Sequence, residues 1–282
     1  MSTAMFRRSA WAAAAVLALG SLSACADNPN CQMPHGAKVC MTTRDVKDLE
    51  AVRAAGKALL EGPGVTSEVL ITPPVDPSGS STDQIAGTGR YRGDAADPKV
   101  GGSYEMAFTQ DGHTDTARYA GGRTYVQYWK AADPSGKPYW VGLSEASLAK
   151  KGDELGAVAW RARASNPLMT ARLLADFAPA GGDSFSRAGS DGRELQLRID
   201  AMNMSSAGAD MLTSAFPDHS PTAVKVDLRM DAEQRVTWFE VTMDLRYYGA
   251  TDVRVRVMHT FKPAGGPVTL QAPNQVLNEQ KS

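Results

Sequence analysis

The sequence is poor in the side chains from which most metal and redox centres are built. Its 282 residues include three cysteines and four histidines. The histidines are scattered along the chain, at positions 35, 113, 219 and 259, and neither they nor the cysteines have the spacing of a zinc site. We therefore expect no bound metal and no redox centre.

An excess of charge of one sign is also missing. Thirty Lys and Arg residues stand against 31 Asp and Glu residues, which gives a formal net charge of −1. A domain that binds nucleic acid usually concentrates Lys and Arg in a basic patch or stripe, and the sequence has no such concentration. We expect no nucleic-acid partner.

The chain has no hydrophobic run long enough for a membrane-spanning helix, which needs roughly 20 apolar residues. Its most apolar stretch, from Trp11 to Gly20, is about half that length. Arg7 and Arg8 precede this stretch and small residues follow it. A positive start, a short apolar segment and a small-residue end are typical of a secretion signal.

The signal ends in the sequence "LSAC", whose last residue is Cys25. This motif resembles the lipobox of bacterial lipoproteins, in which a lipoprotein-specific peptidase cleaves before a cysteine that carries diacylglycerol. We expect a signal peptide over residues 1–24, with Cys25 lipidated and holding the protein on the extracytoplasmic face of the cell membrane. An ordinary signal peptide cleaved after Ala24 or Ala26 is the alternative.

Cys31 and Cys40 remain once Cys25 carries lipid. In an oxidising compartment, an even number of cysteines favours a disulfide. A bridge across so short a loop contributes about 2–3 kcal/mol. We expect a lipidated tether over residues 25–41 with a Cys31–Cys40 disulfide, and two free thiols are the alternative.

Motifs for catalysis or cofactor binding are absent from the sequence. The segment "GLSEA", which contains Ser144, lacks the second glycine and the strand-to-helix context of a nucleophile elbow. The segment "GTGRYRG" lies between strands and has a displaced third glycine, unlike a dinucleotide-binding loop. His259 continues the apolar face of its segment, which favours a hydrogen-bonded histidine in the core. We expect no catalytic residue and no cofactor; a hydrolase that uses Ser144 or His259 is a remote alternative.

Hydrophobic periodicity divides the first half of the mature chain into a helix followed by strands. Apolar residues recur at helical spacing over residues 42–62, after Thr42 and Thr43, which are suitable N-caps. Farther along the chain the apolar period becomes two, which predicts short strands separated by Gly, Pro, Asp and Ser turns. The strands are expected over residues 65–71, 83–92, 103–110, 114–120, 123–129 and 138–144.

The middle of the chain is expected to be mainly helical. Asn166 before Pro167 is a strong helix start, because asparagine caps the helix and proline fits its first position. The resulting helix, over residues 167–177, places Met169, Leu173 and Phe177 on one side. A second helix is expected over residues 205–216, and an alternating strand is expected between the two helices, over residues 194–202.

The C-terminal third alternates most clearly. Apolar residues at every second position predict strands over residues 223–231, 235–246 and 252–261. The connections are short, so the three strands should form an antiparallel meander with one apolar face and one polar face. The apolar phase shifts at Phe239, which predicts a β-bulge.

Together with the lipobox and the order of elements, several segments give the chain a family resemblance: "GGRTYVQYW", "PYWVGLS", "NPLMTARLLADF", "VKVDLRMDAEQRVTWFEV" and "HTFKPAGGPVTLQAP". The chain resembles the mycobacterial LppX/LprAFG-type lipoproteins, which share the LolA-like fold. The resemblance implies an α+β fold in which a highly curved antiparallel half-barrel carries short helices on its concave face. It covers most of a single domain over residues 42–275, which leaves residues 276–282 as a tail.

The resemblance also implies a function. Members of the family hold acyl chains in a hydrophobic cavity and move lipids or lipoglycans across the cell envelope, so the expected partners are a membrane lipid or lipoglycan and an envelope transport protein. A non-enzymatic envelope sensor or assembly scaffold with a closed core is the alternative. The cavity is expected to be lined by Met169, Leu173, Phe177, Leu197, Met211, Val226, Leu228, Val255 and Val257.

Overall fold

The fold was analysed in a computed structural model of the whole chain. The residues that it describes are 31–32, 39–40, 43–75, 84–97, 100–132, 136–144, 154–177, 185–188, 194–199, 219–247 and 252–278. Within them, no helix has the length and apolar character needed to cross a membrane. The signal peptide, Cys25 and the helix expected over residues 205–216 lie outside the described residues.

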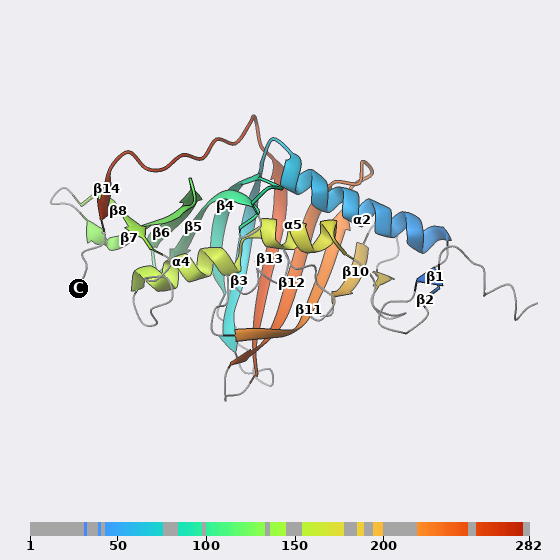
Figure 1. Cartoon of the computed structure of the whole chain (residues 1–282). Coiled ribbons are helices and arrows are strands. Elements are labelled where there is room, and N and C mark those ends of the chain that lie inside the picture. Colours follow the sequence, from blue (N-terminus) through green and yellow to red (C-terminus); the bar gives the residue numbers. More distant parts are fainter. Residues whose placement is uncertain are drawn as a thin grey trace, which may run out of the picture.

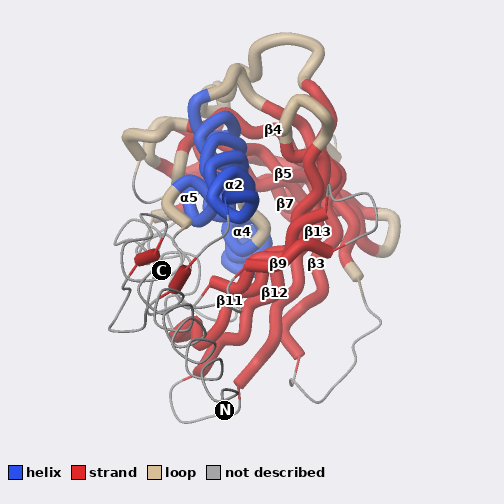
Figure 2. The backbone as a smooth tube through the Cα atoms, turned by 90° about the vertical axis from the view of Figure 1, so that its right-hand side faces the viewer, coloured by secondary structure: helices blue, strands red, loops and turns tan. Residues whose placement is uncertain are grey.

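In the described part of the chain, twelve strands form one open and strongly curved sheet (Figures 1 and 2). Their order is β14-β8-β7-β6-β5-β4-β3-β13-β12-β11-β10-β9, and the pairs are antiparallel except β14 with β8. The strands are β3 (Val65–Val75), β4 (Ile85–Gly93), β5 (Gly102–Gln110), β6 (His113–Ala120), β7 (Arg123–Ala132), β8 (Pro138–Leu143), β9 (Phe185–Ala188), β10 (Glu194–Ile199), β11 (His219–Met230), β12 (Val236–Tyr247), β13 (Asp252–Pro263) and β14 (Val276–Asn278).

Three helices of the described chain lie across the concave face of this sheet: α2 (Thr43–Glu61), α4 (Glu154–Ala164) and α5 (Pro167–Ala175). The expected α+β class, with a curved sheet and helices on its concave side, is therefore confirmed. The sequence analysis did not predict α4.

The predicted start of α5 is confirmed in detail. The Asn166 side-chain oxygen accepts a hydrogen bond from the Leu168 backbone N–H at 3.1 Å, and Pro167 occupies the first turn. The Asn166 amide nitrogen donates to the Val100 carbonyl oxygen at 2.9 Å. The cap thus starts the helix and fastens it to the segment that leads into β5.

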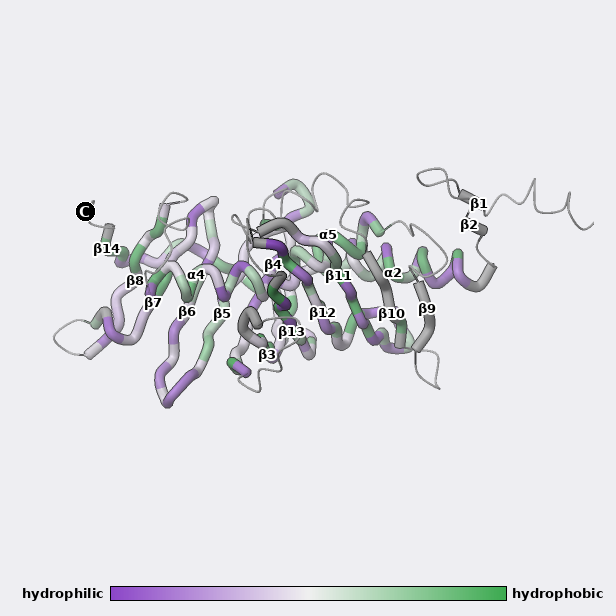
Figure 3. Tube along the Cα trace, turned by 90° about the horizontal axis from the view of Figure 1, so that it is seen from below, coloured by the Kyte–Doolittle hydropathy of each residue, from purple (hydrophilic) through white to green (hydrophobic). Residues whose placement is uncertain are grey.

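The strands alternate between the two faces of the sheet as predicted. In β5, Tyr104, Met106 and Phe108 are at most 1% exposed, whereas Glu105 and Ala107 face the other side and are half-buried. Figure 3 shows hydrophobic and hydrophilic residues mixed along the strands in the same way. The apolar residues face the helices, so the core lies between the helices and the concave face.

The three C-terminal strands form the predicted antiparallel meander, β11-β12-β13. The β-bulge lies two residues earlier than the sequence analysis placed it: Arg229 pairs with Trp238 but Met230 pairs with Val236, which leaves Thr237 as the extra residue. The pattern misplaced it because Trp238 is not on the apolar face. Instead, the centre of the Trp238 ring lies 4.7 Å from the Arg229 guanidinium carbon.

A short paired strand lies near each end of the described residues. The short strands β1 (Cys31–Gln32) and β2 (Val39–Cys40) are antiparallel, with Cys31 directly opposite Cys40 in the backbone register. This register suits the expected disulfide, which stays a prediction. At the other end, Val276–Asn278 is not a tail as expected but the strand β14, whose backbone completes the edge of the sheet beside β8.

Candidate functional site

The concave face of the meander is lined by aliphatic and thioether side chains. Directly opposite residues share a face of a sheet, and Val226, Val241 and Val257 are opposite one another across β11, β12 and β13. The inward-facing residues of this region are each at most 2% exposed, and we call them the aliphatic half: Val224, Val226, Leu228, Val241, Met243, Leu245, Val255 and Val257.

The helix α5 faces this interior with the side chains that the sequence analysis selected. Met169, Leu173 and Phe177, which follows the helix, are 3–4% exposed and belong to the same hydrophobic cluster as the aliphatic half. The structure places these residues in the one hydrophobic core of the described chain: Met169, Leu173, Phe177, Val226, Leu228, Val255 and Val257. The backbone of Leu197 in β10 is opposite Val226, and Met211 lies outside the described residues. That these residues line a cavity stays a prediction.

The helices α2 and α5 pack closely on each other, and each helix approaches the sheet backbone at one or two strands. A Cβ atom on Gly56 of α2 would lie 2.4 Å from the Ala175 nitrogen and 2.6 Å from the Ala171 oxygen of α5. A Cβ atom on Gly93, at the end of β4, would lie 2.2 Å from the Leu60 oxygen of α2. Among the described elements, α2 and α5 come closest to the sheet backbone at β4, and α4 comes closest at β6 and β7.

The centre of the interior is aromatic rather than aliphatic. Tyr104 and Tyr119 stack with their ring centres 5.8 Å apart, and the ring centres of Phe239 and Phe261 are 5.1 Å apart. The imidazole of His259 lies against both of these rings, with its centre 5.0 Å from that of Phe239 and 5.7 Å from that of Phe261. The interior therefore changes from stiff rings at its centre to flexible aliphatic chains over the meander.

His259 is the polar centre of this aromatic region and is fully buried. Its Nε2 lies 2.8 Å from the Ser165 carbonyl oxygen, its Nδ1 lies 2.9 Å from Ser67 Oγ, and Ser67 Oγ lies 3.1 Å from Tyr91 Oη. Because a carbonyl oxygen only accepts, Nε2 carries the proton and Nδ1 accepts from the Ser67 hydroxyl. The Tyr91 hydroxyl donates to Ser67 in turn. Every member of the chain has a partner, so the prediction of a hydrogen-bonded core histidine is confirmed.

Burial fixes the ionisation states of His259 and Tyr91 in this hydrogen-bonded chain. Loss of water lowers the pKa of His259 to about 3, although its hydrogen bond to Ser165 acts in the opposite direction. Burial also raises the pKa of Tyr91. Both groups are neutral near pH 7. The sequence analysis missed Ser67, which is 192 residues from His259 and is embedded in an otherwise ordinary strand.

The two residues of the hydrolase alternative are not neighbours. Ser144 directly follows β8 and is exposed, whereas His259 is in β13. Five strands lie between β8 and β13 in the sheet. The pair cannot act as nucleophile and base, because such a pair must lie within hydrogen-bond distance.

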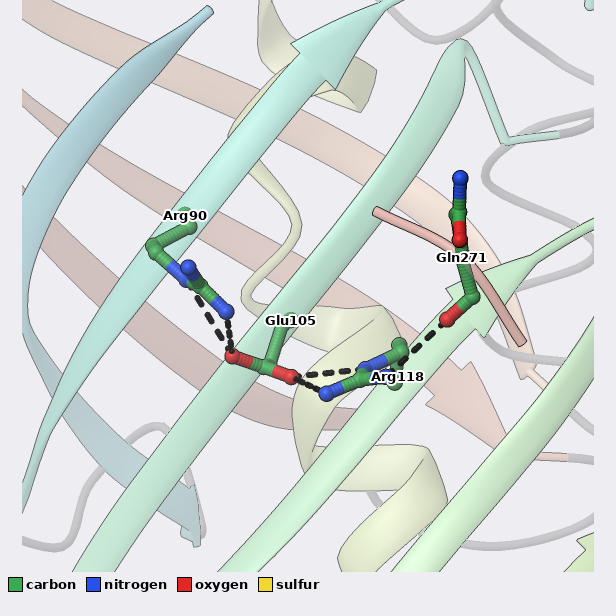
Figure 4. A network of polar contacts seen from close by, with 4 residues as sticks. All are labelled: Arg90, Glu105, Arg118 and Gln271. Atoms are coloured by element: carbon green, nitrogen blue, oxygen red, sulfur yellow. Dashed lines mark hydrogen bonds and ion pairs between the residues drawn. The ribbon is translucent and has the colours of Figure 1, made fainter. Parts of the chain in front are cut away.

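The convex face carries paired charges. Glu105 accepts hydrogen bonds from Arg90 at 2.5 Å and from Arg118 Nε at 2.6 Å, and Arg118 Nη1 donates to the Gln271 carbonyl oxygen at 2.9 Å (Figure 4). A groove of about 290 Å³ lies beside this network, lined by Thr66, Ser67, Glu68, Thr88, Gly89, Arg90, Glu105, Ala107 and Lys262. Its charged side chains bond to one another, Arg90 to Glu105 and Lys262 to Glu68. We interpret this surface as structural. The described residues contain no cluster of His, Cys, Asp and Glu that could hold a metal ion.

No family model and no curated protein matches the chain. Among solved structures, a DUF1329 family protein from Desulfovibrio piger aligns over 77% of this chain and 91% of its own, with 8% identity and a TM-score of 0.27. A porin-like protein from Bacteroides uniformis aligns over 72% of this chain and 99% of its own, with 11% identity and a TM-score of 0.22. Similarity at this level carries no functional conclusion.

Proposed function

We propose that this protein is a lipid-anchored, extracytoplasmic lipid carrier of the LppX/LprAFG type with a LolA-like fold. It takes up the acyl chains of a membrane lipid or lipoglycan between α5 and the aliphatic half, and passes them to an envelope transport partner. No covalent chemistry is involved. The observation that supports this proposal is the aliphatic half itself, a continuous surface of Val, Leu and Met side chains on the concave face of the meander.

The physical argument concerns what such a surface can accept. An acyl chain that leaves water gains about 0.8 kcal/mol for each buried CH₂ group. Met169 and Met243 are unbranched, so they can change rotamer to fit chains of variable shape. The helices α2 and α5 approach the sheet backbone most closely at β4, and the hydrogen bond between His259 and Ser165 ties the start of α5 to β13. Entry of a chain therefore requires the C-terminal end of α5 to move away from the meander.

The neutral hydrogen-bonded network from Tyr91 to Ser165 has a structural role in the proposed carrier. Its central histidine is fully buried and surrounded by aromatic rings. A buried polar chain with every group satisfied specifies one arrangement of its neighbours. We assign it the role of holding the junction between α4 and α5 on the sheet.

The test uses the domain with Cys25 replaced by serine, exported by its native host and purified without a lipid anchor. Solvent extraction followed by mass spectrometry should release lipid in near-stoichiometric amount. The delipidated domain should then bind palmitate. Val226→Phe, which fills the aliphatic half, should weaken palmitate binding at least tenfold.

Lys225→Phe is the matched control, since Lys225 is the exposed neighbour of Val226 on the same strand. It should bind palmitate like the parent domain. Thermal unfolding of both variants checks that each is folded, and Met243→Phe replaces Val226→Phe if the latter is not. A domain that yields no lipid and binds no palmitate would contradict the carrier function and leave the sensor or scaffold alternative.

A further inference from the structure

The edge strand β14 is attached to the sheet by few contacts. Its three residues pair in parallel with Trp140, Val141 and Gly142 of β8, and parallel pairing is slightly less stable per residue than antiparallel pairing. Leu277, the central residue of β14, is 50% exposed. The pairing therefore buries little apolar surface, and β14 can leave β8 at a small cost in free energy.

The segment before β14, residues 269–275, is also held at few points, and we call it the connector. Each of its side chains is exposed or half-buried. At the surface, its Gln271 carbonyl oxygen accepts a hydrogen bond from Arg118 at 2.9 Å. Val268, just before the connector, is 6% exposed, and its backbone N–H donates to the Pro63 carbonyl oxygen at 3.0 Å. The connector and β14 can therefore detach together without removing a side chain of their own from the core.

The connector is close to its full length. Val268 lies at the ends of β3 and β4, because a Cβ atom on Gly64 would lie 2.6 Å from Val268 Cβ and 2.7 Å from the Tyr91 carbonyl oxygen. In the sheet, β14 is five strand spacings from β4, or about 24 Å at about 4.8 Å each. The eight residues that lead from Val268 to Val276 span at most about 28 Å. Figure 1 shows the connector running along the ends of the strands. A short hinge under tension favours exchange of the element that it carries.

The β14 of a second copy fits the same edge of β8, because it brings the same side chains and the same backbone groups. The sequence has no charged residue between Lys262 and Glu279, so two connectors can cross without repulsion between like charges. Pro273 restricts the backbone at its own position and at the residue before it, which keeps a detached connector extended. Exchange in both directions closes a pair with two-fold symmetry.

We propose that β14 is exchanged between two copies of this chain, so that the β14 of each copy pairs with the β8 of the other. The exchanged pair has the same β14–β8 contacts as two single copies, and concentration therefore decides between the two states. The connector holds β14 near its own β8 at an effective concentration of about the millimolar range, and exchange becomes substantial as the protein approaches that range. The lipid anchor proposed above would raise the local concentration, but the exchange itself does not depend on the carrier function.

The experiment changes the length of the connector. Deleting Asn274 and Gln275, which are both exposed, shortens its reach to about 21 Å, less than the distance to β8 of its own chain. A β8 edge of a second copy is not limited to that distance. We expect light scattering to give this variant twice the monomer mass at concentrations at which the parent domain is a monomer. Hydrogen exchange at Val141 should stay as slow as in the parent, because the β14 of the second copy covers the edge.

Deleting residues 281–282 is the matched control, since it also removes two residues but leaves the connector intact, and this variant should have the monomer mass. Leu277→Pro in the shortened variant should halve its mass, because proline interrupts strand pairing. A dimer that survives Leu277→Pro uses another interface, and this result would overturn the proposal. A shortened variant with the monomer mass would also overturn it, whether exchange at Val141 is fast or slow.

A longer connector gives a second measurement that does not depend on the folding of the shortened variant. Inserting Gly-Ser-Gly-Ser after Ala272 relaxes the connector and should lower the fraction of dimer that the parent domain shows at millimolar concentration. Thermal unfolding of each variant checks that it is folded. Equal fractions of dimer in the parent and in the insertion variant, or a parent that stays monomeric at millimolar concentration, would contradict exchange through the connector.

Discussion

Ser67 Oγ lies 2.9 Å from His259 Nδ1, in the middle of a buried chain that joins β3 to the junction of α4 and α5. The carbonyl of Ser165 at one end fixes the direction of every proton in the chain. Tyr91 donates to Ser67, Ser67 donates to His259, and His259 donates to Ser165. The helices are therefore held on the sheet by directed hydrogen bonds as well as by apolar contact.

This directionality predicts unequal effects of removing the two hydroxyls. Ser67→Ala leaves two buried groups without a partner, the Tyr91 donor and the His259 Nδ1 acceptor, and should lower the free energy of unfolding by about 2–4 kcal/mol. Tyr91→Phe removes only the first donor and should cost about 0.5–1.5 kcal/mol. Urea denaturation measures both values. Equal losses, or a larger loss for Tyr91→Phe, would contradict the assigned direction.

The same hydrogen-bonded chain, through His259, predicts how the free energy of unfolding depends on pH. The pKa of His259 is about 3 in the folded protein and about 6.5 in the unfolded chain. Between these values the unfolded chain binds the extra proton, so the free energy of unfolding falls as the pH decreases below 6.5. The loss between pH 7 and pH 5.5 from this residue should be about 1 kcal/mol.

The control for this pH effect is His259→Gln, which cannot titrate. Urea denaturation of the parent and the variant at both pH values separates the histidine from all other groups. The difference in stability between the two proteins should shrink by about 1 kcal/mol on going to pH 5.5. An unchanged difference would show that His259 is not held neutral by burial.

The contact between α2 and α5 at Gly56 predicts a strong effect of one methyl group. In Gly56→Ala the new Cβ would lie 2.4 Å from the Ala175 nitrogen, and this nitrogen belongs to the backbone and cannot rotate away. The helices must separate, so the free energy of unfolding should fall by about 1–3 kcal/mol. Gly265→Ala is the control, since no atom lies within 4 Å of its Cβ position, and it should be neutral in thermal unfolding. A neutral Gly56→Ala would mean that the helices are not closely packed.

The strands of the meander were predictable because their physical cause is local. Each alternates apolar and charged residues over its length, and a strand with one buried face requires that pattern. Asn166 was predictable for the same reason, since its cap acts on the next two residues. Trp238 does not follow the alternation of apolar residues, and for this reason the β-bulge was predicted two residues away from its observed position.

Features that depend on distant partners could not be predicted. Nothing around Ser67 indicates His259, because the sheet brings β3 and β13 together only after the whole chain has folded. The helix α4, with the sequence "ELGAVAWRARA", has small residues on several sides and so lacks a clear apolar stripe. Its packing depends on β6 and β7.

The segment that follows β13 is held to the sheet at widely separated points. The Val268 backbone N–H donates to the Pro63 carbonyl oxygen at 3.0 Å, and the Val268 carbonyl oxygen accepts from Arg92 at 3.4 Å. Arg118 then contacts Gln271, and β14 pairs with β8. In Figure 1 this segment runs past the ends of the strands from β13 to β14. It places β14 beside β8, whose outer edge would otherwise have no neighbouring strand.

Deleting residues 271–282 tests that role. The deletion removes β14 and the Gln271 carbonyl, so the outer edge of β8 is exposed with unsatisfied backbone groups, which promote pairing with other chains. We expect faster hydrogen exchange at Val141 and a concentration-dependent increase in mass by light scattering. Deleting residues 279–282 is the control, because it keeps β14 and should leave both measurements unchanged. A monomeric 271–282 deletion with unchanged exchange would show that the edge of β8 is protected without β14.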